Sequence, residues 1–245
     1  MKKTGRQRID QLLVDRGLVE SRAKAQSLIL AGNVLVNGQR ADKPGHSVAD
    51  DADLRLLEQL RYVSRGGLKL EGALRHWNIN PAGWICIDIG SSTGGFIDCL
   101  LQHGAARVYS VDVGSTQLDW KIRTDPRVVI RDHTNARALT PEQIGEPCRL
   151  AVCDVSFISV TLLLPAIASV LQPADGEMVI LVKPQFEVGR DDVGKGGIVR
   201  DPELHAAACS KVERAVRELG FQTDVIESPI QGAEGNREFL LHATH

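Results

Sequence analysis

The chain has few aromatic side chains, which make up 4% of its 245 residues, and it contains five cysteines. No two of these cysteines form a Cys-x-x-Cys pair, and no histidines accompany them at the spacing of a zinc site. An odd number of cysteines at irregular positions is typical of a reducing compartment, where they serve as small buried residues. We therefore expect a cytoplasmic protein that holds no metal.

Long hydrophobic runs are also missing. The first ten residues carry charges but no apolar segment, so we expect no signal peptide. The longest apolar stretch, 158–171, contains Pro165 and is too short to span a bilayer. We expect a core helix there, and we expect no membrane partner.

The composition, with 43% hydrophobic and 24% charged residues, is that of a globular protein with room for one large and one small domain. The charge is unevenly distributed along the chain. Residues 1–75 carry 14 Lys and Arg against 9 Asp and Glu, whereas the other 170 residues carry 15 against 22. A basic N-terminal segment on an acidic body suggests that this segment binds an anionic partner.

The N-terminal segment has the pattern of a compact unit over residues 6–60. Helical spacing of apolar residues predicts one helix from about residue 9 and a second over 22–31, for which Ser21 is a good N-cap. A short strand over 34–36 then runs into Asn37-Gly38, a strong signal for a hairpin turn.

Segments 8–13, 21–25 and 29–38 of this unit resemble the S-four-type RNA-binding domain. The resemblance implies that a basic helix face binds structured RNA, mostly through phosphates. Judged from the charges alone, an ordinary solvated face explains them equally well. The candidate RNA-binding residues are Arg6, Arg8, Arg22 and Lys24, together with Arg65 in the segment that follows.

A glycine-rich loop follows the apolar run 84–87, which predicts a buried strand, and precedes a helical pattern from about residue 94. Glycines let the backbone approach a ligand closely, and a helix N-terminus offers free N–H groups. The spacing does not match the dinucleotide fingerprint G-x-G-x-x-G. The pattern D-x-G-x-x-x-G-G instead resembles the cofactor loop of S-adenosylmethionine-dependent methyltransferases. The candidate cofactor-binding residues of this loop are Asp88, Gly90, Ser91, Ser92, Thr93, Gly94, Gly95 and Phe96.

Acidic residues also end the strands expected after this loop. Asp112, followed by Val113, fits a carboxylate that binds the ribose hydroxyls, Asp132 is placed to face the adenine edge, and Asp154 ends the next strand. Each alone is compatible with an ordinary strand-end residue. Their joint position at successive strand ends, where open α/β sheets bind ligands, favours a cofactor site.

Strands and helices alternate from residue 84 onward, which predicts a mostly parallel sheet with helices on both faces. The predicted strands are 84–89, 108–112, 127–131, 150–154, 177–183, 221–227 and 237–242, and the predicted helices include 158–171 and 202–219. We therefore expect an α/β, Rossmann-like methyltransferase sheet over residues 61–245, after a small α+β RNA-binding domain over residues 1–60.

A second glycine-rich segment, 189–197, matches the phosphate-loop pattern G-x-x-x-x-G-K. Gly196 stands where that motif has the Ser or Thr that binds magnesium. We therefore interpret this segment as a mobile loop beside the site, with no role in nucleotide triphosphate binding.

Four charged residues stand out by position, namely Lys69, Asp154, Lys183 and Glu238. A charge that closes an apolar strand is costly without a partner, although each one alone is compatible with a strand end that meets solvent. In this order they resemble the catalytic tetrad of RNA 2′-O-methyltransferases of the FtsJ type. The resemblance implies that Lys183 is the general base, that Asp154 and Glu238 orient it, and that Lys69 steadies the acceptor and its developing oxyanion.

Over its full length the chain is similar to the TlyA family, also called haemolysin A. The similarity rests on the RNA-binding unit and on segments 64–69, 90–96, 111–114, 154–159 and 181–189. It implies a ribosomal RNA methyltransferase that acts on cytidine 2′-hydroxyls of the small or large subunit, or both. S-adenosylmethionine would be the donor, no metal would be required, and ribosomal RNA or ribosomal subunits would be the partners. The alternatives are a membrane-active haemolysin and a non-catalytic ribosome-binding factor.

Overall fold

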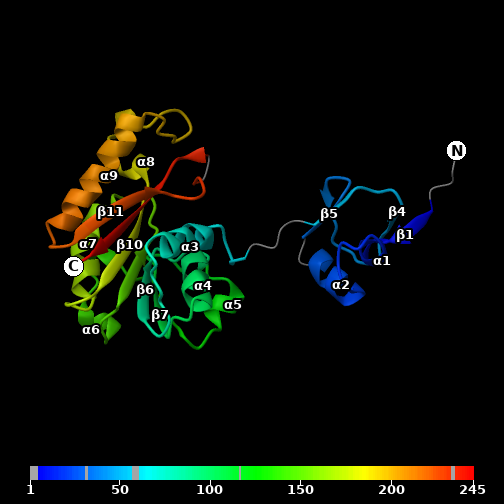
Figure 1. The fold of residues 1–245 in the computed structure, drawn as a ribbon, viewed down its shortest axis with the longest axis horizontal. Helices are drawn as coiled ribbons and strands as arrows, with labels where there is room; N and C mark the ends of the chain where they lie inside the picture. Colours follow the sequence, from blue (N-terminus) through cyan, green and yellow to red (C-terminus); the bar gives the residue numbers. More distant parts are fainter. Residues whose placement is uncertain (1–4, 31–32, 57–60, 116, 233–234) are drawn as a thin grey trace. The chain divides into compact units, whose positions relative to one another are not determined.

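The chain forms two compact units, Met1–Leu60 and Arg61–His245. In the computed structural model, the described residues are 5–30, 33–56, 61–115, 117–232 and 235–245. Figure 1 shows both units, with labels on many of their helices and strands.

The N-terminal unit packs two helices against short antiparallel strands. β1 pairs with β4, and β2 lies between β3 and β5. Leu13, Ile29 and Val34 are fully buried between the helices and strands. Asn37 and Gly38 both have positive φ, which confirms the predicted hairpin turn. The elements are β1 (Arg6–Arg8), α1 (Ile9–Asp15), α2 (Arg22–Leu30), β2 (Val34–Val36), β3 (Gln39–Arg40), β4 (Ser47–Ala49) and β5 (Leu54–Leu56).

The larger unit is built on a seven-stranded sheet with the order β11-β12-β10-β9-β6-β7-β8. Strands β6 to β10 are parallel, whereas β12 runs antiparallel to both β10 and β11. The strands are β6 (Ile85–Ile89), β7 (Arg107–Val111), β8 (Val128–Arg131), β9 (Leu150–Cys153), β10 (Glu177–Val182), β11 (Gln222–Glu227) and β12 (Phe239–Thr244). The α-helices are α3 (Gly66–His76), α4 (Gly95–Gln102), α5 (Trp120–Arg123), α6 (Pro141–Ile144), α7 (Leu164–Ser169), α8 (Pro184–Glu187) and α9 (Pro202–Arg217), and the 3₁₀ helices are η1 (Ala136–Ala138), η2 (Val160–Leu162) and η3 (Arg190–Asp192).

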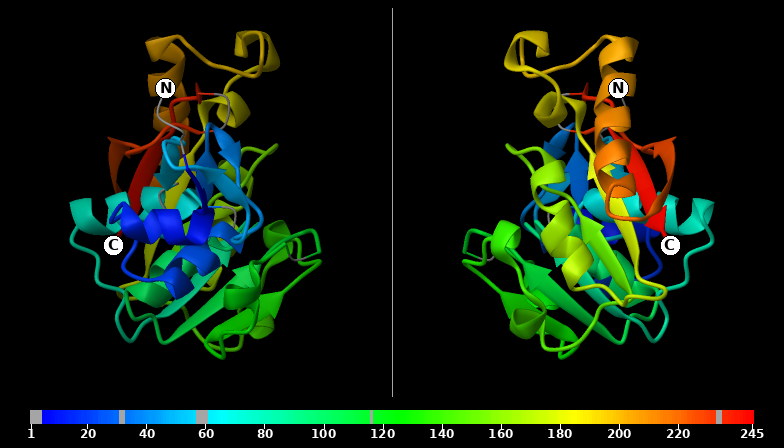
Figure 2. Two further views of the ribbon diagram at one scale, coloured as in Figure 1. Left: turned by 90° about the vertical axis from the view of Figure 1, so that its right-hand side faces the viewer. Right: turned by 90° about the vertical axis from the view of Figure 1, so that its left-hand side faces the viewer.

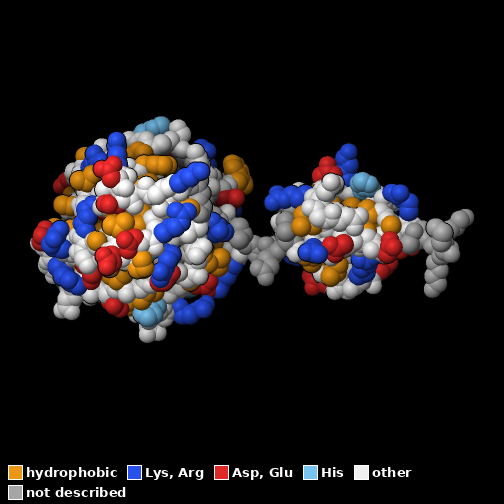
Figure 3. Space-filling model, turned by 90° about the horizontal axis from the view of Figure 1, so that it is seen from above, with side chains coloured by type: hydrophobic (Ala, Val, Ile, Leu, Met, Phe, Trp, Pro, Cys, Tyr) orange, Lys and Arg blue, Asp and Glu red, His pale blue; other side chains and the backbone are white. Residues whose placement is uncertain are grey.

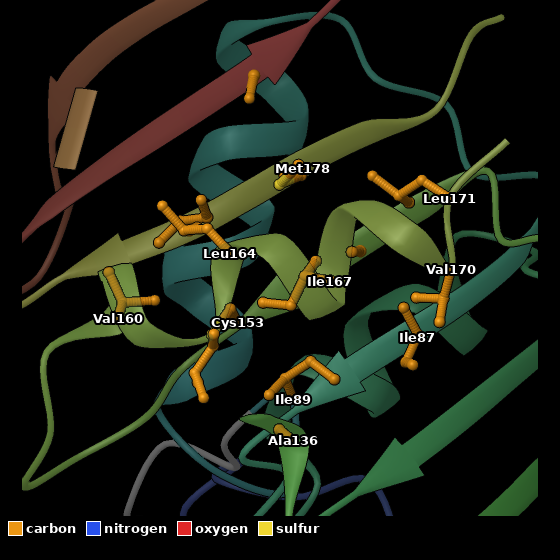
Figure 4. Packing of buried hydrophobic residues seen from close by; sticks show 14 of the residues in the cluster. Ile87, Ile89, Ala136, Cys153, Val160, Leu164, Ile167, Val170, Leu171 and Met178 are labelled. Atoms are coloured by element: carbon orange, nitrogen blue, oxygen red, sulfur yellow. The ribbon is translucent and has the colours of Figure 1, made fainter. Parts of the chain in front are cut away.

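Helices cover both faces of this sheet (Figure 2), as the alternating pattern predicts. On one face Leu164 and Ile167 of α7 pack with Ile87 and Ile89 of β6 (Figure 4), and α9 extends the same layer. On the other face the apolar sides of α3, α4 and α5 pack on the alternate residues of the strands, such as Cys86, whose side chains point to that face. The burial of both faces explains why the parallel strands read as continuous apolar runs.

The predicted helix over 158–171 is wrong as a single element. The segment forms η2, then the short helix α7, in which Pro165 occupies the first turn. Proline suits that position because it lacks an N–H and fixes φ, but it cannot lie in the middle of a continuous helix.

The glycine-rich segment after Gly189 forms η3 and then a single β-bridge between Gly194 and Ile198. A phosphate-binding loop instead leads directly into a helix. Among the described residues, none of the helices has both the length and the apolar character needed to cross a membrane.

The topology gathers charged residues at one edge of the sheet. The carboxyl ends of β6 to β10 lie there, and the strand order reverses between β6 and β9, which is where open α/β sheets bind ligands. Because β12 is antiparallel, the residue that precedes it, Glu238, comes to the same edge. The β10–β12 register, in which Val182 is opposite Phe239, places Glu238 beside Lys183 along the edge.

Candidate active site

A cleft of about 960 Å³ opens at this edge, at the carboxyl ends of β6, β7 and β9. The wall includes apolar side chains, such as Ile158 and Leu163, and backbone and polar groups from the loops. A cleft of this size accommodates a ligand as large as a nucleoside derivative. The predicted site residues that line it are Gly90, Ser92, Asp112, Val113 and Asp154.

Gly90 allows β6 and β9 to approach one another at the floor of the cleft. It has φ of +84°, and a Cβ on it would lie 2.5 Å from the carbonyl oxygen of Asp154. Gly94 also has positive φ and caps α4. These positions require glycine both for backbone conformation and for space.

Asp112 is already oriented toward the loop. Its carboxylate accepts hydrogen bonds from the backbone N–H of Ser92 at 3.2 Å and from that of Gly114 at 2.9 Å. These bonds hold the glycine-rich loop against the end of β7, at the rim of the cleft.

Asp88, in β6, is 1% exposed, and neither of its carboxylate oxygens has a hydrogen-bond partner among the described residues. Burial, and next the nearby carboxylate of Asp154, raise the pKa of Asp88 well above its usual value. Asp132, after β8, also has a buried carboxylate oxygen without a partner in that part of the chain. Buried acceptors are normally satisfied, so unsatisfied ones beside a cleft indicate a missing donor.

Other predicted cofactor residues lie outside the cleft wall. A Cβ on Gly95 would collide with the hydroxyl of Ser64, and the ring of Phe96 is buried close to Gly66 at the start of α3. Both positions therefore serve the contact between α4 and α3. The predicted cofactor residues that do not line the cleft are Asp88, Ser91, Thr93, Gly94, Gly95, Phe96 and Asp132. Of the four predicted catalytic residues, only Asp154 lines it, and Lys69, Lys183 and Glu238 do not.

Lys183 forms an ion pair with Asp154, with 2.6 Å between Nζ and Oδ1. The Lys183 ammonium also donates a hydrogen bond of 2.9 Å to the hydroxyl of Ser156. The Lys183 side chain is 12% exposed and that of Asp154 24%, so the pair is partly desolvated. Asp154 lines the cleft, whereas Lys183 is not part of the wall. The contact with Asp154 is the one expected from the sequence, whereas the contact with Ser156 is seen only in the structure.

Lys69 and Glu238 form a second ion pair, with 2.5 Å between Nζ and Oε2. Both side chains are buried, at 10% and 3% exposure. The orienting partner of Lys183 in the structure is therefore Asp154, and the partner of Glu238 is Lys69. The sequence predicts that Glu238 orients Lys183, whereas in the structure Glu238 pairs with Lys69, because residue order carries no information about pairing.

Phe157 lines the cleft but is not among the site residues predicted from the sequence. Its ring is 88% exposed, it lines the cleft, and its φ is +69°, an unusual value for a non-glycine residue. The ring of Phe186 lies 5.4 Å away, centroid to centroid. The sequence does show an aromatic residue three positions after Asp154, in a chain with few aromatic residues.

In the N-terminal unit, two of the predicted RNA-binding arginines converge on one buried carboxylate. Asp10 accepts hydrogen bonds from Arg8 at 2.8 and 2.9 Å, from Arg22 at 3.2 Å and from Gln26 at 2.9 Å. The arginine side chains remain about half exposed, at 49% and 50%. Their guanidinium groups are thus held in place while still facing solvent.

The other candidates for RNA binding are less constrained. Arg6 donates to the carbonyl oxygen of Ser47 at 2.6 Å, and Lys24 and Arg65 are exposed. Figure 3 shows Lys and Arg side chains among Asp and Glu side chains on the visible face of each unit. The visible face of the N-terminal unit is therefore of mixed charge and not uniformly basic.

No cluster of three or more His, Cys, Asp or Glu side chains in the described ranges is arranged to hold a metal ion. The five cysteines are buried and unpaired.

Comparisons with known proteins agree with this arrangement. Residues 62–245 match the family of FtsJ-like methyltransferases, and residues 7–53 match the S4 domain. The fold and site thus define a methyltransferase of the FtsJ-like class that carries an S4 domain.

The similarity to individual proteins is closer still. The 16S/23S rRNA (cytidine-2′-O)-methyltransferase TlyA of Mycobacterium tuberculosis is 48% identical over 96% of this chain and 89% of that protein. Hemolysin A of Brachyspira hyodysenteriae is 43% identical over 96% of this chain and 98% of that protein. A solved structure from Streptococcus thermophilus is 46% identical, with a TM-score of 0.74 over 98% of this chain and 89% of that one. The chain belongs to the TlyA family.

Proposed function

We propose that this protein transfers a methyl group from S-adenosylmethionine to the ribose 2′-hydroxyl of a cytidine in ribosomal RNA of the small subunit, the large subunit or both. The observation that carries the proposal is the ion pair of Lys183 with Asp154, because Asp154 is also part of the cleft wall. The reaction is the one named for the Mycobacterium tuberculosis relative.

The residues around the cleft fit S-adenosylmethionine. Asp112, at the rim of the cleft, is proposed to bind the ribose hydroxyls. Asp132, which precedes the lining residue His133 and has an unpartnered buried oxygen, is proposed to accept a hydrogen bond from the adenine edge. Gly90 and the loop after it would let the ligand approach the backbone. When bound, this cofactor supplies a methyl group that is already electrophilic because it is attached to a sulfonium.

Lys183 is the proposed general base. A ribose hydroxyl is a very weak acid, so its proton must be removed as its oxygen attacks. In its neutral form Lys183 accepts this proton at Nζ and becomes an ammonium, which the Asp154 carboxylate at 2.6 Å stabilises.

Lys69 is proposed to steady the acceptor oxygen as negative charge develops on it. Glu238 holds the Lys69 ammonium in one position, and the burial of both side chains strengthens this electrostatic contact. In this proposal the Lys183–Asp154 pair accepts the proton of the hydroxyl, and the Lys69–Glu238 pair stabilises the negative charge that develops on its oxygen.

RNA recognition is assigned to both units. Arg8 and Arg22, held by Asp10, are suited to phosphate contacts, and Arg6, Lys24 and Arg65 add positive charge. In the cleft, the exposed ring of Phe157 offers a surface on which a nucleobase can stack. A ribosomal substrate also supports a cytoplasmic location.

The test is transfer of a tritiated methyl group from S-adenosylmethionine to ribosomal RNA and ribosomal subunits. We expect Lys183→Ala to lower the rate by about 10²- to 10⁴-fold, the usual contribution of a general base. Arg237→Ala is the matched control, because Arg237 lies next to Glu238 and forms an exposed pair with Glu227. A folded Lys183→Ala protein with the wild-type rate would overturn the assignment, and failure of the wild type to bind the cofactor in calorimetry would favour a non-catalytic ribosome-binding factor.

A further inference from the structure

A buried carboxylate that the proposed chemistry does not use lies a short distance from the catalytic pair. Glu187 is the last residue of α8, the short helix whose N-cap is Lys183. Its side chain is 2% exposed and does not line the cleft. A buried charge with no task in the chemistry is costly unless it is well satisfied.

Glu187 is satisfied almost entirely by the loop that carries Asp154. Its Oε2 accepts a hydrogen bond of 2.5 Å from the hydroxyl of Ser159, and its Oε1 accepts one of 2.7 Å from the backbone N–H of Val160. The Ser159 hydroxyl is also 2.7 Å from that of Thr161. The carboxylate therefore fixes the far end of the loop, five residues beyond Asp154.

Lys211 of α9 completes the arrangement. Its ammonium lies 3.0 Å from Oε2 of Glu187 and donates a hydrogen bond of 2.8 Å to the backbone carbonyl of the same residue. Helix α9 packs against the sheet and lies beside α8 (Figure 1). The carboxylate is thereby tied to a long and rigid element.

The segments 154–160 and 183–187 are consequently joined at three successive places. Lys183 contacts Asp154 and Ser156, the rings of Phe157 and Phe186 lie 5.4 Å apart, and Glu187 holds the far end of the loop. Phe157, in the middle, has the strained positive φ, which persists only where the surroundings determine it.

We infer that Glu187, with Ser159 and Lys211, is a positioning residue that fixes the two segments so that Lys183 and Asp154 meet at the distance catalysis requires. This inference rests on the proposed function for the roles of Lys183 and Asp154. Misplacement of a reacting group by about 1 Å costs about 10²-fold in rate, so the bracing has a measurable effect on turnover.

The principal variant is Glu187→Gln, which preserves the shape of the side chain but removes the charge that faces Lys211 and replaces one of the two accepting oxygens by an NH2 donor. We expect the single-turnover rate of methyl transfer to fall by about 10- to 100-fold. The dissociation constant for S-adenosylmethionine is expected to stay within threefold, because Glu187 does not line the cleft. Adding Lys211→Met should restore at least half of the lost rate on a logarithmic scale, since the amide then no longer faces an uncompensated ammonium.

The matched control is Glu177→Gln. Glu177 is the first residue of β10, the strand that ends just before Lys183. Its side chain is 15% exposed and pairs with Arg149 and His242. We expect Glu177→Gln to lower the melting temperature by about as much as Glu187→Gln does, but to leave the turnover rate unchanged. Equal losses of rate in the Glu177→Gln and Glu187→Gln proteins would overturn the inference, as would a wild-type rate in Glu187→Gln.

A readout that needs no catalysis separates this inference from the proposed function. Amide hydrogen exchange over 154–160 should accelerate in Glu187→Gln and remain unchanged in Glu177→Gln. If Lys183→Ala proves fully active, the proposed base is wrong, yet the exchange data still decide whether Glu187 braces the loop. Unchanged exchange in Glu187→Gln would overturn the bracing role, whatever Lys183 does.

Discussion

The ammonium of Lys69 lies 2.5 Å from the carboxylate of Glu238, across 169 positions of sequence. The pair joins the first turn of α3 to the residue that precedes β12. A Cβ on Gly232 would collide with this carboxylate, so the backbone of the preceding loop also encloses Glu238. The contact therefore stabilises the fold, and substitutions can separate this contribution from the catalytic role proposed for Lys69.

Removal of one partner should be far more costly to stability than removal of both. Glu238→Ala or Lys69→Ala leaves a buried charge alone, and we expect a loss of about 3–5 kcal/mol in the free energy of unfolding. The double variant Lys69→Met with Glu238→Gln should lose much less, because no charge remains, although methyl transfer should still be abolished. Denaturant unfolding and the transfer assay measure the two effects, and a double variant as unstable as the single ones would contradict the argument.

Substitution of glycine should affect Gly90 more than Gly83. Both have positive φ, +84° and +76°, but a Cβ on Gly83 meets nothing within 4 Å, whereas one on Gly90 meets the Asp154 carbonyl. We expect Gly83→Ala to cost about 1–2 kcal/mol from backbone strain alone. Gly90→Ala should lower the free energy of unfolding by more than Gly83→Ala does, and it should also weaken cofactor binding, as measured by calorimetry. Equal effects of the two substitutions would show that the close approach at Gly90 is unimportant.

Substitution of Phe157 should weaken RNA binding without destabilising the fold. The ring is 88% exposed, so Phe157→Ala removes little buried surface and should change the unfolding free energy by no more than about 0.5 kcal/mol. Loss of a stacked base should weaken binding of substrate RNA by about 1–3 kcal/mol. Filter binding measures this loss, with Leu162→Ala as the control because Leu162 is exposed but does not line the cleft. If Phe157→Leu binds RNA as tightly as the wild type, stacking is not the reason for the exposed ring.

The N-terminal unit should lose stability in acid through Asp10. The hydrogen bond from Arg8 is the largest of the contributions that hold the pKa of Asp10 below its usual value. Because the pKa is lower in the folded state, the stabilisation is complete above the unfolded value of about 4 and is lost as pH falls from there toward the folded value. Asp10→Asn should therefore be less stable at pH 7 but show a flatter dependence on pH below 5.

Amide exchange of α1 and α2 is the suitable measurement for that variant, because residues 1–60 contain no aromatic residue to report unfolding by fluorescence. Asp53→Asn is a control, since Asp53 forms an exposed pair with Arg55. An Asp10→Asn protein with an unchanged pH profile would show that the arginine contacts do not stabilise the folded state.

Much of this architecture could be predicted from the sequence. Apolar runs that end in Asp88 and Asp154 marked strands of a buried parallel sheet, and local chemistry placed the Asn37-Gly38 turn and the Ser21 cap, whose side chain accepts from the N–H of Lys24. The class and family followed from motifs with specific spacing. Local signals of this kind depend only on neighbouring residues, which explains their success.

What could not be predicted depends on tertiary contacts. The partner of Glu238 is determined by where α3 packs, and the break between η2 and α7 coincides with the anchoring of Val160 by Glu187. The side chain of Phe96 belongs to the α3–α4 contact, although its place in the motif suggested a ligand. Sequence patterns indicate which face of an element is buried but not which residue it meets.

The long separation between Lys69 and Glu238 also bears on how the protein folds. The glycine-rich loop and Asp112 lie within 25 residues of each other and can assemble early, because short loops cost little entropy to close. The ion pair across 169 positions must await the docking of β12 beside β10. We therefore expect a refolding chain to become able to bind its cofactor before it becomes able to use it.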